Sequence, residues 1–91
     1  MSPSLYSRTQ DVIEADVGGE IVVLHTQNWQ YFEFDRTGTA IWNLLREPMA
    51  LGTLVDDLMS QYDVDRTRCT EETQAFLDDM VEQGLITAGE G

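Results

Sequence analysis

The chain has 91 residues, enough for one compact domain with a modest hydrophobic core. Its formal net charge is -12, from 17 acidic residues against five arginines and no lysine, so it lacks the basic face that nucleic-acid partners need. A single cysteine excludes an internal disulfide, and no apolar run is long enough for a signal peptide or a membrane span. We therefore expect a soluble cytoplasmic protein without nucleic-acid or membrane partners.

Three short strands are predicted in the first third of the chain. They cover residues 11–15, 20–25 and 29–34, where side chains alternate in polarity or are β-branched. Gly18 and Gly19 form a turn after the first strand, and Thr26 to Asn28 form one after the second. Because these connections are short, we expect an antiparallel meander with the third strand at one edge. Residues 1–8 are expected to be loose.

Three helices are predicted in the remainder of the chain. They cover about residues 36–46, 51–62 and 66–83, where apolar residues recur at three-and-four spacing. Asp35 is a favourable N-cap for the first helix, and either Asp65 or Thr70 caps the third. Gly84 is a natural stop for the third helix. The tail, residues 87–91, is expected to be frayed.

This order of elements predicts an α+β fold, in which a three-stranded antiparallel sheet is followed by a three-helix bundle, as in winged helix-turn-helix domains. We expect one domain over residues 1–91, with an ordered core of about residues 11–86. Phe32 and Phe34 should face the helices, whereas Trp29 and Tyr31 should lie on the opposite face. Exposed aromatics beside an open edge strand favour a peptide site by β-augmentation, although the edge could also pair with a second copy.

The residues that carry chemistry form no catalytic or metal-binding pattern. His25 is the only histidine, Cys69 is remote from it in sequence, and neither has the spacing of metal ligands. Asp63 and Asp65 begin a calcium-loop pattern that lacks its glycine and its final glutamate. We expect no enzyme activity, no catalytic residue, no metal and no cofactor.

A winged-helix DNA-binding regulator is one alternative, since strands and three helices could form such a domain. Its recognition helix should be rich in arginine and lysine. Here residues 71–90 hold six acidic residues and no basic one, which are Glu71, Glu72, Asp78, Asp79, Glu82 and Glu90. We expect DNA to repel such a helix.

Three stretches of the chain, in this order, resemble the PqqD family of leader-peptide recognition elements. They are VVLHTQNWQYFEFDRTGTAIWNLL, LVDDLMSQYDVD and FLDDMVEQGLI, and the resemblance covers about residues 12–86. Within this family, the chain is similar to the stand-alone proteins of lasso-peptide clusters. The proteins of pyrroloquinoline quinone synthesis are the alternative, but their usual Pro-Glu-Gly and Cys-Asp-Gly motifs are absent.

The resemblance implies a non-catalytic protein that binds the leader of a precursor peptide and delivers it to a separate leader peptidase of the cysteine-protease type, with a cyclase acting later. The leader would add as a strand beside residues 29–34 and fill a cleft against the third helix. The residues expected to bind it are Trp29, Gln30, Tyr31, Phe32, Glu33 and Phe34 from the strand, and Glu72, Ala75, Phe76, Asp79, Met80 and Gln83 from the helix. Glu72 and Asp79 either pair with a basic leader residue or only face solvent.

Overall fold

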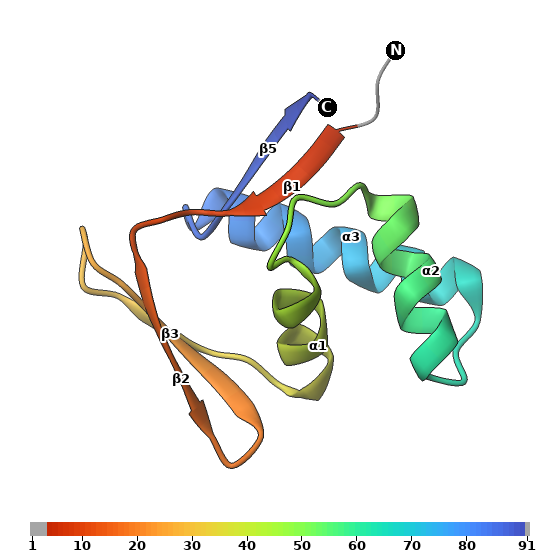
Figure 1. The fold of residues 1–91 in the computed structure, drawn as a ribbon, viewed down its shortest axis with the longest axis horizontal. Coiled ribbons are helices and arrows are strands. Elements are labelled where there is room, and N and C mark those ends of the chain that lie inside the picture. The colour runs from red at the N-terminus through yellow and green to blue at the C-terminus, as the bar shows by residue number, and fades with distance from the viewer. Residues whose placement is uncertain (1–3, 91) are drawn as a thin grey trace.

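The computed structural model describes residues 4–90, which form an α+β arrangement of two small antiparallel sheets and three helices (Figure 1). The strands are β1 (Ser4–Arg8), β2 (Val12–Val17), β3 (Glu20–His25), β4 (Tyr31–Glu33) and β5 (Ile86–Glu90). The helices are α1 (Arg36–Leu44), α2 (Leu51–Gln61) and α3 (Arg66–Glu82). The predicted α+β class, with three helices after an antiparallel sheet, is confirmed.

The predicted meander is the sheet formed by β2, β3 and β4, in which β3 is central and β4 lies at one edge. Gly18 and Gly19 close the turn between β2 and β3 with φ values of 67° and 92°, which residues with a Cβ rarely adopt. The side chain of Asp16 accepts a hydrogen bond from the backbone N–H of Gly19 at 2.8 Å. This hairpin was therefore predictable from its turn chemistry.

The third strand is shorter than predicted, because β4 begins at Tyr31 rather than at Trp29. Trp29 has a φ of 60°, in the left-handed region that interrupts a strand. Its N–H donates to the carbonyl oxygen of His25 at 2.9 Å, and the N–H of His25 donates to the carbonyl oxygen of Gln30 at 2.8 Å. Residues 26–30 therefore form the whole turn between β3 and β4.

Aspartate side chains fix the starts of two helices as predicted. Asp35 accepts a hydrogen bond from the N–H of Gly38 at 2.8 Å, and Asp65 accepts one from the N–H of Arg68 at 3.1 Å. Ala50, at the start of α2, offers no such side-chain bond. The three helices begin where the sequence places them and end within two residues of the predicted positions.

The end of α3 is a Schellman motif centred on Gly84, whose φ is 79°. The N–H of Leu85 donates to the carbonyl oxygen of Met80 at 2.9 Å, and that of Gly84 donates to Val81 at 3.1 Å. Leu85 and Ile86 then turn back into the core, with 0% and 1% of their surface exposed. This places the following strand, β5, beside the start of the chain (Figure 1).

The prediction for both ends of the chain was wrong over the described residues. Residues 4–8 form β1 rather than a loose segment, and residues 86–90 form β5 rather than a frayed tail. The two strands pair antiparallel, from Ser4 opposite Glu90 to Arg8 opposite Ile86. Tyr6 also exchanges backbone hydrogen bonds of 2.8 and 3.0 Å with Met49, on the other side of β1. Residues 1–3 and 91 lie outside the described residues.

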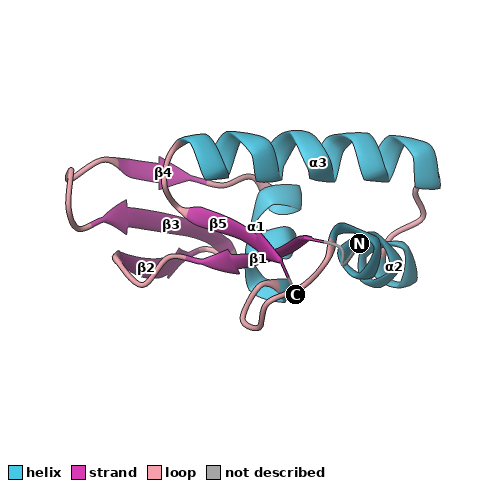
Figure 2. Ribbon diagram, turned by 90° about the horizontal axis from the view of Figure 1, so that it is seen from above, coloured by secondary structure: helices cyan, strands magenta, loops and turns pink. Residues whose placement is uncertain are grey.

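The core lies between the inner face of the β2–β3–β4 sheet and the three helices (Figure 2). Its largest fully buried side chains are Trp42, Ile41, Leu45, Leu54, Leu77, Leu85 and Ile86. Along β3, the inward residues Ile21, Val23 and His25 are buried, whereas the residues between them are half-buried on the other face. Within residues 4–90, no helix is both long and apolar enough to cross a membrane.

Candidate functional site

β4 offers unpaired backbone groups at the edge of the sheet. The N–H of Phe34 donates to Ile21, and Gln30 accepts from His25, so alternate residues of this segment bond toward β3. In an antiparallel ladder the intervening residues point their N–H and C=O groups the other way. The outward groups of β4 therefore belong to Tyr31 and Glu33. Together they present two donors and two acceptors to an added strand.

The side chains of β4 divide between two faces. Phe32 lies opposite Val23 and packs half-buried against the core, on the side of the helices. Tyr31 and Glu33 are exposed on the other face, with 66% of the Tyr31 surface accessible. Sequence reasoning placed these three side chains in one cleft, but strand alternation directs only Phe32 toward the helices.

Phe76 joins α3 to the end of β4 and to the start of α1. Its ring packs edge-on against that of Phe34, with 5.3 Å between ring centroids and 74° between ring planes. This approach depends on Gly38, because a Cβ there would lie 3.0 Å from Cε1 of Phe76 and 3.2 Å from Cβ of Phe34. The glycine therefore lets the three elements meet closely beside the β4 edge.

The predicted binding residues of α3 differ in their accessibility. Glu72, Ala75 and Asp79 are exposed, while Phe76 and Gln83 are half-buried. Met80 on α3 and Phe34 after β4 are 5% and 6% exposed, so both lie in the core beneath this surface. Glu72, Phe76, Asp79 and Gln83 recur at three-and-four spacing and so follow one side of the helix. Figure 2 shows β4 near the C-terminal end of α3, from which the helix extends away toward α2.

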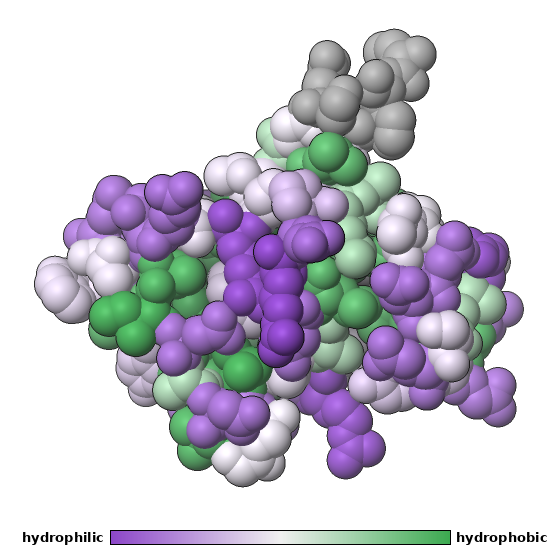
Figure 3. Space-filling model, viewed as in Figure 1, coloured by the Kyte–Doolittle hydropathy of each residue, from purple (hydrophilic) through white to green (hydrophobic). Residues whose placement is uncertain are grey.

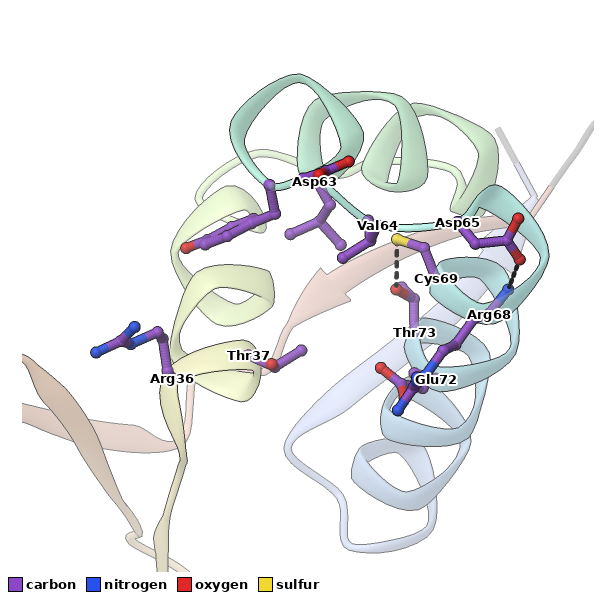
Figure 4. A pocket seen from close by; sticks show the side chains of 11 residues that line it. Arg36, Thr37, Asp63, Val64, Asp65, Arg68, Cys69, Glu72 and Thr73 are labelled. Atoms are coloured by element: carbon purple, nitrogen blue, oxygen red, sulfur yellow. Dashed lines mark hydrogen bonds and ion pairs between the residues drawn. The ribbon is translucent and has the colours of Figure 1, made fainter.

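A surface pocket of about 360 Å³ lies where α1, α2 and α3 meet (Figure 4). Leu58, Cys69 and Thr73 are its buried lining residues. Its more exposed lining residues are Arg36, Thr37, Tyr62, Asp63, Val64, Asp65, Arg68 and Glu72. Of the predicted leader-binding residues, this pocket includes only Glu72, whose carboxylate accepts a hydrogen bond from Nε of Arg68 at 3.0 Å. The pocket lies along the first half of α3, beyond the end of β4.

Sequence reasoning missed this pocket because its residues come from separate elements. Arg36 and Thr37 open α1, Tyr62 follows α2, and Cys69 and Thr73 lie one turn apart on α3. The one local signal is the spacing of Cys69 and Thr73, whose Sγ and Oγ1 atoms lie 4.0 Å apart. The rest depends on how the helices pack.

The geometry provides no Cys–His pair. Nε2 of His25 lies beside Gly84, just after the end of α3, whereas Cys69 lies in the first turn of that helix. Fifteen helical residues separate those positions by roughly 22 Å. Nδ1 of His25 instead accepts a hydrogen bond from the N–H of Gln27 at 3.2 Å. Across residues 4–90, no three His, Cys, Asp or Glu residues gather as a metal site.

Comparisons with known proteins agree with this architecture. The family model described as "Coenzyme PQQ synthesis protein D (PqqD)" matches residues 20–86. A solved structure described as TbiB1 in complex with the TbiA(beta) leader peptide is 31% identical, with a TM-score of 0.82 over 88% of this chain and 93% of that chain. A lasso peptide synthetase B1 complexed with the leader peptide is 20% identical and shares the fold, with a TM-score of 0.80 over 90% and 96% of the two chains. No curated protein matches the chain. The family match and the 31% identity together place this chain in the PqqD family.

Proposed function

We propose that this protein is a non-catalytic recognition element that binds the leader of a ribosomally made precursor peptide of the lasso type. The observation that carries the proposal is the open edge of β4, where Tyr31 and Glu33 direct their backbone groups outward, and where Phe34, just after this strand, packs on Phe76 of α3. The proteins of the two similar solved structures each hold a leader peptide, which supports the same role here.

In the proposed complex the leader adds as a strand beside β4 and exchanges backbone hydrogen bonds with Tyr31 and Glu33. Its side chains on the helix side meet the half-buried rings of Phe32 and Phe76, which supply apolar contact. Asp79 and Glu72, exposed on α3, attract a basic leader residue. Trp29 and Gln30, in the turn that leads into β4, contact one end of the added strand.

The protein itself performs no chemistry in this proposal. It acts in the cytoplasm and presents the bound leader to a separate leader peptidase of the cysteine-protease type, which cleaves it, and a cyclase then acts on the released peptide. The separation of His25 from Cys69 supports this division of labour, because a thiol nucleophile needs a nearby base.

The test is a proline that removes a single outward hydrogen-bond donor. Glu33→Pro deletes the N–H that the leader needs but leaves the ladder to β3, since that N–H points away from β3. Glu33→Ala is the matched control, because it removes the same carboxylate and keeps the N–H. We expect Glu33→Pro to weaken binding of a fluorescent leader by about tenfold, measured by anisotropy, and Glu33→Ala to retain most of it.

The leader for this experiment is that of the precursor encoded beside the gene, with a scrambled peptide of the same composition as the negative control. Hydrogen exchange provides the second readout. The amides of Tyr31 and Glu33 should be protected only when leader is present, whereas those of β2 should not change. Equal binding by the proline and alanine variants, or protection at β2 instead, would refute the β4 site.

A second candidate is the role for which the matching family is named, coenzyme PQQ synthesis. In that case the protein would bind the peptide precursor of the cofactor at the same edge and pass it to a radical enzyme. Titration of the two peptides against the same preparation separates the candidates, since only the cognate one should compete with the labelled leader.

The DNA-binding alternative receives no support from α3. After Arg68 this helix carries only acidic charges, and Glu71, Glu72, Asp78, Asp79 and Glu82 are all exposed. DNA would meet a repulsive surface there. A gel shift that weakens steeply with salt would revive this alternative.

A further inference from the structure

The side of the β2–β3–β4 sheet that faces away from the helices is apolar and uncovered in the described chain. Ile13, Leu24 and Tyr31 lie opposite one another in consecutive strands, so they form one row across the sheet. Ala15 and Val22 begin a second row, and Val17 lies beyond them at the end of β2. These six residues are called the outer face below. Ile13, Val17 and Tyr31 are 58%, 62% and 66% exposed.

Acidic residues border the outer face. Glu33 completes the second row, and Glu20 lies opposite Val17, so both carboxylates share the face with the apolar residues. No arginine occurs in β2, β3 or β4, since Arg8 is on β1 and the other four follow β4. Figure 3 shows green hydrophobic surface among purple polar surface over the region where Figure 1 places β2 and β3.

This pattern favours a partner with an apolar centre and a basic rim. Apolar contact supplies affinity at the middle of an interface, and complementary charges at its edge select the partner and speed association. A second copy of this chain fits poorly, because two chains of net charge -12 would place Glu20 and Glu33 against the same residues. The leader does not cover the face either, because it adds in the plane of the sheet beside β4.

We infer that the outer face docks a protein whose contact surface has an apolar centre rimmed by arginine and lysine, and that this protein is the peptidase that receives the leader. The inference rests on the proposed function. It assigns the docking surface to the sheet side opposite the helices, away from α3 and from the pocket between the helices.

The bound leader completes this surface. An added strand beside β4 continues each row of the sheet by one residue, so alternate leader side chains would extend the rows that contain Tyr31 and Glu33. A peptidase seated on the outer face would then contact protein and leader together. The peptidase therefore binds the loaded protein more tightly than the empty one, so the loaded protein outcompetes the empty one for the peptidase.

The experiment uses the full chain, its leader and the leader peptidase encoded in the same gene neighbourhood. Ile13→Arg places a cation at the centre of the outer face, on the strand farthest from the leader edge. Val81→Arg is the matched control, because Val81 is also exposed, at 38%, and lies on the side of α3 away from Phe76 and Asp79. Leader affinity is measured by anisotropy, peptidase binding by interferometry with and without leader, and leader cleavage by mass spectrometry.

We expect Ile13→Arg to weaken peptidase binding and slow leader cleavage by about tenfold or more, with leader affinity within about twofold of the unmodified protein. Val81→Arg should change none of the three. Peptidase binding should weaken with added salt and should strengthen about fivefold or more when leader is present.

Several results would overturn the inference. One is that Ile13→Arg leaves peptidase binding unchanged. Another is that Ile13→Arg weakens leader binding as much as it weakens peptidase binding, which would assign the face to the leader. A salt-insensitive complex would exclude the basic rim, and a lack of leader dependence would exclude the composite surface. A dimer in sedimentation that Ile13→Arg dissociates would assign the face to a second copy. If the leader does not bind but the peptidase still docks on this face, the proposed function fails while the docking surface stands.

Discussion

The guanidinium of Arg8 lies over the indole ring of Trp42, 4.6 Å from the ring centroid, and its Nε donates to the carbonyl oxygen of the same residue at 3.0 Å. Nη1 of Arg8 pairs with Glu14 at 2.9 Å, and Glu14 also accepts from Nε1 of Trp42 at 3.3 Å. The contact therefore joins β1, β2 and α1. Burial lowers the pKa of Arg8, and the neighbouring carboxylate of Glu14 opposes this shift.

Replacing this arginine should cost more than replacing a surface arginine. Arg8→Ala removes charge-assisted hydrogen bonds and the stacking contact, so we expect the free energy of unfolding to fall by about 1.5–3 kcal/mol. Arg66→Ala is the control, because its pair with Asp56 is exposed on both sides and should contribute about 0–1 kcal/mol. Urea denaturation of both variants measures the difference. Equal losses would mean that the Arg8 contact adds nothing beyond a surface ion pair.

Trp42 is completely buried, and its ring also packs 5.4 Å from that of Phe34. Trp42→Ala should therefore lower the free energy of unfolding by about 3–5 kcal/mol, enough to unfold much of a small domain. Trp42→Phe keeps most of the apolar volume and should cost clearly less. Thermal melts followed by circular dichroism distinguish the two, and similar melting temperatures would contradict the packing seen here.

Substitution by alanine should have opposite effects on stability at Gly38 and at Gly52. Both are helical glycines, so alanine gains up to about 1 kcal/mol of helix propensity at either position. At Gly52 nothing lies within 4 Å of the added Cβ, and Gly52→Ala should stabilise the protein. At Gly38 the Cβ meets Phe76 and Phe34, and overpacking typically costs about 1–3 kcal/mol, so Gly38→Ala should destabilise it. Denaturant midpoints test the sign at each position.

The acidic side of α3 provides a test of leader recognition. Asp79→Arg reverses a charge on the side of the helix that also carries Phe76, so we expect leader affinity to fall by about tenfold with little change in stability. Asp78→Arg makes the same charge change about 100° around the helix, where the carboxylate accepts from Gln74 at 2.8 Å. Anisotropy titrations compare the two. An equal effect of both would indicate general electrostatics, and no effect would assign Asp79 to solvent alone.

The starts of α1 and α3 and the end of α3 were predictable because they are chemically marked within a few residues of sequence. Asp35 and Asp65 bond the backbone as N-caps, and Gly84 adopts the positive φ that ends α3. The β2–β3 hairpin was predictable for the same reason, since Gly18 and Gly19 determine its turn. Each of these signals is local, so it needs no knowledge of the rest of the fold.

The β1–β5 pairing has no such local signal. Each of these strands is stabilised by the other, although nearly the whole chain separates them in sequence. β1 also forms backbone hydrogen bonds with Met49. The position of β4 at the sheet edge followed from chain order, but its start at Tyr31 depended on the left-handed conformation of Trp29. A tryptophan in that conformation is uncommon, so propensity alone could not place the turn.

The candidate site also has one part that could be expected from the sequence and another part that depends on tertiary packing. The resemblance to the PqqD family implied that Phe32 and Phe76 line a cleft beside β4, and both side chains pack against the core on the helix side of the sheet. Met80 and Phe34 belong to the core instead, because the helix and strand turn those positions fully inward. The pocket between the three helices depends on tertiary packing and could not be read from spacing.

The pairing of β1 with β5 also makes the fold a good candidate for circular permutation. Ser4 and Glu90 are opposite one another in register, so a short flexible linker could join these positions. New termini opened between Gly18 and Gly19 would interrupt only an exposed turn. Such a rearranged chain would keep β4 and α3 intact while moving its free ends to the hairpin tip beside Val17, where an attached reporter would sense whatever docks on the outer face.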